Sequence, residues 1–259
     1  MKYLLALLTA VVLVPTLRPV DTFAQISLGD FDCDECGGTD CDAAGNCCVS
    51  GGGLYFGGET VILQPYAQDG YVTDSEHVQD SVGLRVWTGY ESSNGLGIRF
   101  RYFNLDATTV NSGDITGIDV QYFDLEATTS LDFCNTQILL SGGVRFAEFN
   151  SYWDGDQYAD IDERGFTFGI QLDRQLCENL SFFGWFQESI LFGDDKIHYT
   201  GYVQTWTELQ FGLQYDGCVA GRNVYLRGGV EGQYHTGVFE DNHYDSGLFG
   251  YFVGGGVTF

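Results

Sequence analysis

The last stretch of the chain, residues 248–259, constrains the fold more than any other. One parity of this stretch carries apolar side chains, at Phe249, Tyr251, Val253, Val257 and Phe259. The other parity carries small ones, at Gly250, Gly254, Gly256 and Thr258. Because strand side chains alternate between two faces, this pattern predicts a strand with one wholly apolar face. A soluble sandwich would cover its second face with polar groups, whereas glycine suits a crowded barrel interior.

The aromatic ending resembles the C-terminal signal strand of bacterial outer-membrane β-barrels. That resemblance implies that Tyr251, Val253, Val257 and Phe259 form a signal read by the barrel-assembly machinery. It also implies that the outer face of the protein contacts outer-membrane lipid and lipopolysaccharide.

The start of the chain has the pattern of an export signal. Lys2 precedes an apolar run over residues 3–14, which is too short to span a bilayer as a helix. Thr22-Phe23-Ala24 then offers a cleavage site, so residues 1–24 are expected to be a signal peptide. An uncleaved N-terminal anchor is the alternative.

Residues 25–53 form an acidic, cysteine-rich leader with too few apolar residues to bury a core. Its cysteines are Cys33, Cys36, Cys41, Cys47 and Cys48. Structural disulfides are favoured in an exported chain, while a redox or zinc role for Cys33-x-x-Cys36 is the alternative. The aspartates match no EF-hand spacing, so we expect no cofactor or metal site, although acidic loops could bind divalent cations.

From residue 54 to the end, the chain alternates between strand and turn patterns, which predicts an all-β, antiparallel, up-and-down transmembrane barrel of about ten strands. The expected strands are 54–66, 79–91, 95–106, 117–131, 136–149, 163–174, 180–193, 202–215, 222–234 and 247–259. The formal charge of −25 argues against nucleic acid as a partner. The fourth strand changes parity near Tyr122, which we interpret as a β-bulge.

The connections between these strands alternate in length. Short ones are expected at 92–94, 132–135, 175–179 and 216–221. Long ones are expected at 67–78, 107–116, 150–162, 194–201 and 235–246. Outer-membrane barrels have short periplasmic turns and long outer loops. Cys134, Cys177 and Cys218 each fall in a short connection, so we predict that a disulfide ties the leader to the periplasmic rim.

The segment GGGLYFGGETVIL at 51–63, the alternating strands and the aromatic finish resemble the Legionella-type pore-forming outer-membrane protein family. The resemblance covers residues 51–259 and implies a porin-like or structural role in the outer membrane of a didderm bacterium.

Charged side chains at the inward parity of these strands form the candidate site. The expected lumen-lining residues are Arg85, Arg99, Arg101, Arg145, Arg227, Glu59, Asp119, Asp173, Glu208 and Glu231. They could form an ion-selective constriction. The favoured interpretation is an ion-pair network that fills a narrow lumen, because about ten strands enclose little more than side chains.

These patterns leave three function classes. The first is an outer-membrane barrel that acts as a narrow pore or a structural surface protein. The second is an outer-membrane hydrolase, either a protease or a lipid-modifying enzyme, using loop residues such as His77, His198, His235, His243 and Asp241. The third is a soluble secreted barrel that binds a ligand. No catalytic motif is recognisable, so the non-enzymatic class is favoured.

Overall fold

A computed structural model describes residues 52–67, 81–107, 109–111, 114–133, 135–153, 156–177, 179–197, 200–236 and 246–259. The predicted signal peptide and nearly all of the predicted leader lie outside these residues. None of the described residues belongs to a helix long and apolar enough to cross a membrane.

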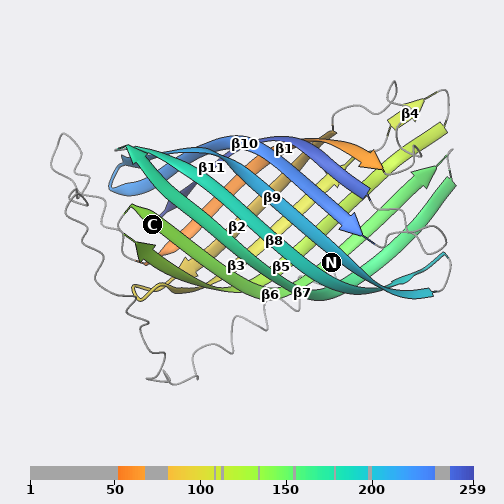
Figure 1. The fold of residues 1–259 in the computed structure, drawn as a ribbon, viewed down its shortest axis with the longest axis horizontal. Helices are drawn as coiled ribbons and strands as arrows, with labels where there is room; N and C mark the ends of the chain where they lie inside the picture. Colours follow the sequence, from red (N-terminus) through yellow and green to blue (C-terminus); the bar gives the residue numbers. More distant parts are fainter. Residues whose placement is uncertain are drawn as a thin grey trace, which may run out of the picture. The chain divides into compact units, whose positions relative to one another are not determined.

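The described residues form an all-β structure with a single antiparallel sheet (Figure 1). Its strands are β1 (Leu54–Ala67), β2 (Ser81–Glu91), β3 (Leu96–Asp106), β4 (Thr109–Asn111), β5 (Asp114–Phe133), β6 (Thr136–Trp153), β7 (Asp156–Cys177), β8 (Leu180–Asp195), β9 (Thr200–Val219), β10 (Arg222–Thr236) and β11 (Ser246–Thr258). Each long strand pairs with its neighbours in sequence. The pairings β1–β11 and β3–β5 close the sheet into a barrel of ten strands, while β4 pairs only with the start of β5.

The predicted up-and-down barrel of ten strands is therefore confirmed. The connections that follow β2, β5, β7 and β9 are short and lie at the end of the barrel that holds Leu54 and Phe259. We call this the short-turn end and the opposite one the long-loop end. The predicted long loop at 150–162 is wrong, because β6 and β7 continue as a paired hairpin through Trp153 and Asp156.

The predicted bulge near Tyr122 is also wrong. The register of β5 with β3 and with β6 runs without a shift through this position. Ile118, Val120 and Tyr122 are all buried on the same face as Asp124. The inward face of β5 changes from apolar to charged along its length, and this change in chemistry looks like a change in parity in the sequence.

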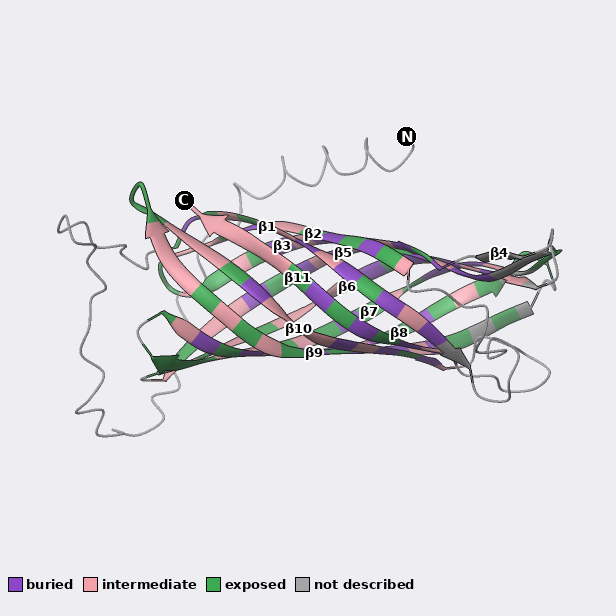
Figure 2. Cartoon of the chain, turned by 90° about the horizontal axis from the view of Figure 1, so that it is seen from above, coloured by how far each residue is buried: buried purple, intermediate pink, exposed green. Residues whose placement is uncertain are grey.

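Burial alternates along the strands, so that buried and exposed positions form stripes around the barrel (Figure 2). Most of the buried apolar and aromatic side chains occupy inward positions on the long-loop side of the barrel. This interior core comprises Val61, Leu63, Phe103, Leu105, Ala107, Ile118, Val120, Tyr122, Ala147, Phe149, Ile161, Phe183, Trp185, Leu191, Trp206, Leu248 and Phe252. The interior is thus packed with side chains, as expected for a barrel of this size.

The glycines of β11 permit close packing where the barrel closes. A Cβ atom on Gly250 would lie 1.9 Å from the backbone oxygen of Ile62 in β1. We expect Gly250→Ala to cost roughly 1–3 kcal/mol, because the backbone of β1 would have to move. Gly232→Ala in β10 is the control, since its new methyl group would meet only the Phe249 ring at 3.9 Å. Denaturant unfolding of the two variants would measure the difference, and equal stabilities would contradict the expectation.

Candidate functional site

Ten charged side chains meet in the middle of the barrel. They are Glu59, Arg85, Arg99, Arg101, Asp124, Glu126, Arg145, Glu208, Arg227 and Glu231, and all are buried. We call this set the ion-pair layer. Charged side chains are almost never buried to this extent unless they are paired.

Strand register explains why these residues meet. Arg99 and Arg101 occupy successive inward positions of β3, and Asp124 and Glu126 occupy successive inward positions of β5. Since β3 and β5 are antiparallel neighbours, Arg99 lies opposite Glu126 and Arg101 opposite Asp124. Arg99 donates to Glu126 at 2.7 Å and Arg101 to Asp124 at 2.6 Å. Matched spacing on neighbouring strands therefore forms these pairs directly.

Arg145 and Arg85 connect the two sides of the barrel. Arg145 in β6 donates to Asp124 at 2.8 Å and forms an ion pair with Glu208 of β9 at 2.6 Å. Arg85 in β2 forms an ion pair with Glu231 of β10 at 2.6 Å and with Glu208 at 3.3 Å. Glu208 therefore forms an ion pair with each of these two arginines and links them across the lumen.

Glu59 of β1 completes the layer. It accepts hydrogen bonds from Arg85, from Arg227 of β10 at 3.0 Å and from Gln210 of β9 at 2.7 Å. The Gln210 amide also donates to Glu231 at 2.6 Å. Each carboxylate in this part of the layer thus has several donors, as buried carboxylates require.

Aromatic rings cover the guanidinium groups. Arg145 lies over the Tyr122 ring at 3.8 Å, Arg101 over Trp185 at 4.6 Å and Arg227 over Phe183 at 4.2 Å. The Tyr122 hydroxyl in turn donates to Glu208 at 2.6 Å. Such contacts between a cation and an aromatic face are strongest when the pair is withdrawn from water, as it is in this buried layer.

The layer is electrically balanced, since it contains five arginines and five carboxylates. Each member forms at least one ion pair within the layer, which leaves no net charge to attract an ion from solution. Arg145 Nη1 and Arg227 Nε are buried without a hydrogen-bond partner among the described residues. A selectivity filter built from charged side chains uses rings of one sign of charge around the ion path. The arrangement therefore favours a closed, structural network over a constriction that selects ions.

Most of the sequence-predicted lumen residues belong to this layer, but two do not. Asp119 projects from the outward parity of β5, opposite Asp106 and Asn150, because the expected bulge is absent. Asp173 lies nearer the short-turn end, where Gln171 donates to it at 2.8 Å. Sequence reasoning missed Asp124 and Glu126 for the same reason that it misplaced Asp119.

A second polar group lies on the long-loop side of the layer. Glu163, Gln204 and His235 are buried, and their side-chain nitrogen and oxygen atoms have no hydrogen-bond partner among the described residues. Ordered water is the usual partner of such groups. His235 was expected in a loop, but it belongs to β10 and stacks on Trp206 at 4.4 Å. The other histidines of the hydrolase hypothesis lie outside the described residues.

Two of the rim cysteines are described. Cys177 is exposed and has a free thiol, whereas Cys218 is disulfide-bonded. The leader cysteines and Cys134 lie outside the described residues, so the predicted tether stays a prediction. In the described residues, no group of three or more histidine, cysteine or acidic side chains is arranged to hold a metal ion.

No protein-family model and no curated protein matches the chain. Solved structures of similar fold include Neisserial surface protein A, at 11% identity and a TM-score of 0.42, covering 81% of this chain and 100% of the other. The outer membrane protease OmpT from Escherichia coli matches at 10% identity and a TM-score of 0.43, and the match covers 80% of this chain and 97% of the protease. The β domain of the Bordetella autotransporter BrkA matches at 14% identity and a TM-score of 0.44, and the match covers 81% of this chain and 99% of that domain. Likenesses of this size transfer no function to the chain.

Proposed function

We propose that the chain is a β-barrel of the outer membrane of a didderm bacterium, and that it serves as a structural surface protein whose lumen is closed by the ion-pair layer. The observation that carries this proposal is the reversed polarity of the barrel. Charged side chains are buried inside it, and large apolar side chains cover its outside. A soluble protein rarely exposes a continuous apolar surface, which instead marks a face that contacts lipid or protein.

The exposed apolar side chains come from every long strand of the barrel. They include Phe56, Ile62, Val82, Leu84, Ile98, Leu131, Leu140, Phe146, Phe166, Phe168, Phe186, Ile190, Leu209, Phe211, Leu226, Tyr251 and Val253. Such an apolar girdle surrounds the barrel on all sides, as a lipid environment requires.

The outward face of β7 gives the height of this girdle. Arg164 and Arg174 face outward, and only Phe166, Phe168, Ile170 and Leu172 share that face between them. Ten residues of a strand tilted as in outer-membrane barrels rise about 25 Å along the barrel axis. That height equals the apolar band of known membrane barrels, with a charged side chain at each boundary.

A closed lumen is favoured over a narrow pore by the packing on both sides of the ion-pair layer. Phe149 and Trp206 are buried toward the long-loop end, and Phe183 is buried toward the short-turn end. Continuous conduction would need these aromatic side chains to leave the lumen. The resemblance to the Legionella-type family is compatible with a structural role of this kind.

Planar bilayers would test the closed lumen. We expect full-length protein, inserted as a barrel whose electrophoretic mobility shifts on heating, to add no steady conductance to the bilayer. Stable conductance steps would contradict the closed lumen and support the pore. The membrane assignment is tested separately by extraction: we expect detergent, and not high salt, to release the protein from the envelope.

A further inference from the structure

One carboxylate faces outward within the apolar girdle. Glu188 in β8 lies between Gln187 and Ser189, both of which are buried inside the barrel, so its own side chain points outward. The register places it opposite Phe168 of β7, between the rows of Arg164 and Arg174. Within the described part of the chain, its one hydrogen bond comes from the Thr207 hydroxyl, at 2.6 Å. Ionisable groups that face lipid are costly and mark functional contacts.

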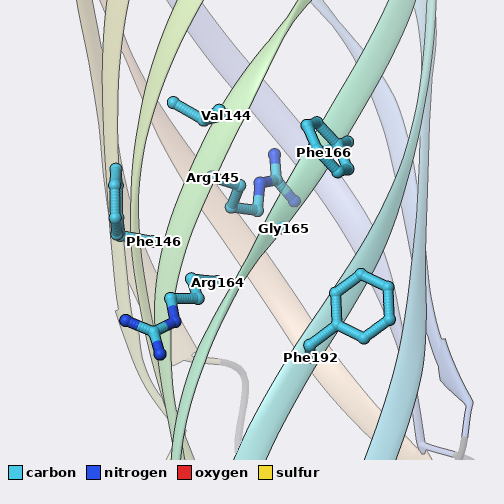
Figure 3. A pocket seen from close by; sticks show the side chains of 7 residues that line it. All are labelled: Val144, Arg145, Phe146, Arg164, Gly165, Phe166 and Phe192. Carbon is cyan, nitrogen blue, oxygen red and sulfur yellow. The ribbon is translucent and has the colours of Figure 1, made fainter.

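An unpaired arginine lies on the same side of the barrel. Arg164 in β7 is exposed and forms no hydrogen bond or ion pair with any other described residue. Beside it, a cavity of about 310 Å³ opens on the outer wall of the barrel, lined by Val144, Phe146, Phe166 and Phe192 (Figure 3). These side chains come from three neighbouring strands, β6, β7 and β8.

Arg164 and Glu188 do not pair within one chain. Arg164 lies opposite Phe192, and Glu188 lies four residues from Phe192 along β8. This spacing separates their Cα atoms by roughly 14 Å. The exposed ring of Phe166 follows Arg164 on the same face of β7, toward the row of Glu188.

We propose that the outer face of β6, β7 and β8 binds a second copy of this chain, with Arg164 of each copy paired to Glu188 of the other. The proposal rests on the membrane assignment above, because two copies inserted in the same membrane have the same orientation relative to it. A two-fold axis along the membrane normal places β7 of one copy against β8 of its partner. Glu188 lies roughly 7–10 Å nearer the short-turn end than Arg164, a difference that two extended side chains can span.

A second copy satisfies both charges at once, which is why we favour it over a bound lipid. The symmetry forms the ion pair twice and removes both carboxylates from lipid. Exposed rings such as Phe166 and Phe168, each 58% exposed, would pack between the copies beside the cavity. A phosphorylated lipid could bind Arg164, but it would leave Glu188 against acyl chains.

Sedimentation equilibrium of the full-length protein in density-matched detergent tests this dimer. We expect wild-type protein to dimerise, and Arg164→Gln or Glu188→Gln to raise the dissociation constant at least tenfold. The double variant should lose little more dimer affinity than either single variant, because each substitution removes the same ion pair. Arg174→Gln is the matched control, since it removes an outward arginine at the other boundary of the girdle, and it should leave the constant unchanged.

The outcomes separate this dimer from the membrane assignment. Wild-type protein that inserts in membranes but sediments as a monomer would overturn the dimer alone. Loss of co-purified phosphorylated lipid in monomeric Arg164→Gln would identify a lipid site instead. Equal effects of Arg174→Gln and Arg164→Gln on the dissociation constant would also overturn the proposed dimer contact. Protein released by high salt without detergent would overturn the membrane assignment and the dimer together.

Discussion

Replacing Arg145 by methionine is expected to destabilise the barrel by roughly 3–5 kcal/mol, because it leaves buried carboxylates without their counter-charge. Arg145 is fully buried and pairs with Asp124 and Glu208. It also covers the Tyr122 ring at 3.8 Å. Adding Glu208→Gln should recover part of the loss, since one of the stranded charges is then removed. Denaturant unfolding of barrels in lipid or detergent would measure both effects.

Lys196 provides the control for this substitution. It lies in the connection after β8 and pairs with Asp160 and Asp162, and its side chain is 49% exposed. Those hydrogen bonds raise the pKa of the Lys196 ammonium group. Lys196→Met should cost only about 0–1 kcal/mol, because solvent screens an exposed pair. If Arg145→Met costs no more than Lys196→Met, water must reach the ion-pair layer and the lumen is not closed.

Replacing Phe259 by lysine is expected to remove most assembled barrel from the outer membrane while export continues. Phe259 donates its backbone N–H to Leu54 of the first strand at 2.8 Å. Its ring packs edge-on against Phe56 with centroids 5.8 Å apart, and Arg222 lies over it at 4.2 Å. The substitution therefore puts a charge where the last strand meets both of its neighbours. The fraction of heat-modifiable protein in isolated outer membranes measures the loss.

Tyr215 is the matched control for this position. It is an outward aromatic residue near the same end of the barrel, and both side chains are 54% exposed. Tyr215→Lys should assemble far better than Phe259→Lys if the chain's last strand carries the assembly signal. Equal losses of assembled barrel in the two variants would show that any charge at the membrane–water interface of this end, and not a change in the terminal strand itself, blocks assembly.

Strand positions could be predicted from the sequence because period-two alternation acts locally. The side chains that fill the lumen could not be predicted in this way, because the inward face of the strands is not uniformly polar. Ile118 and Val120 are apolar and buried with Asp124, so a rule of polar residues inside misplaced Asp119. The acidic start of β7 has no alternating apolar face, so its sequence pattern predicts a loop where the structure has a strand.

Ion-pair partners also lie beyond what the sequence shows. Arg99 and Arg101 meet neighbours in the next strand, and equal spacing of Asp124 and Glu126 could have indicated that match. Arg145 and Glu208, by contrast, meet across the lumen, and that pairing depends on how the strands are staggered around the barrel. Glu188 was missed because Gln187, Glu188 and Ser189 are consecutive polar residues without any parity.

Hydroxyl-radical footprinting of native envelopes, read residue by residue by mass spectrometry, tests the lipid-facing girdle most directly. Phe168 is 58% exposed and Phe211 is 45% exposed on the barrel, yet lipid should protect both from oxidation. Leu176 is 56% exposed and lies beyond Arg174 at the short-turn end, so water should reach it. We expect oxidation of Leu176 and none of Phe168 or Phe211. Oxidation of either phenylalanine as fast as Leu176 would mean that water, and not lipid, covers the outside of this barrel.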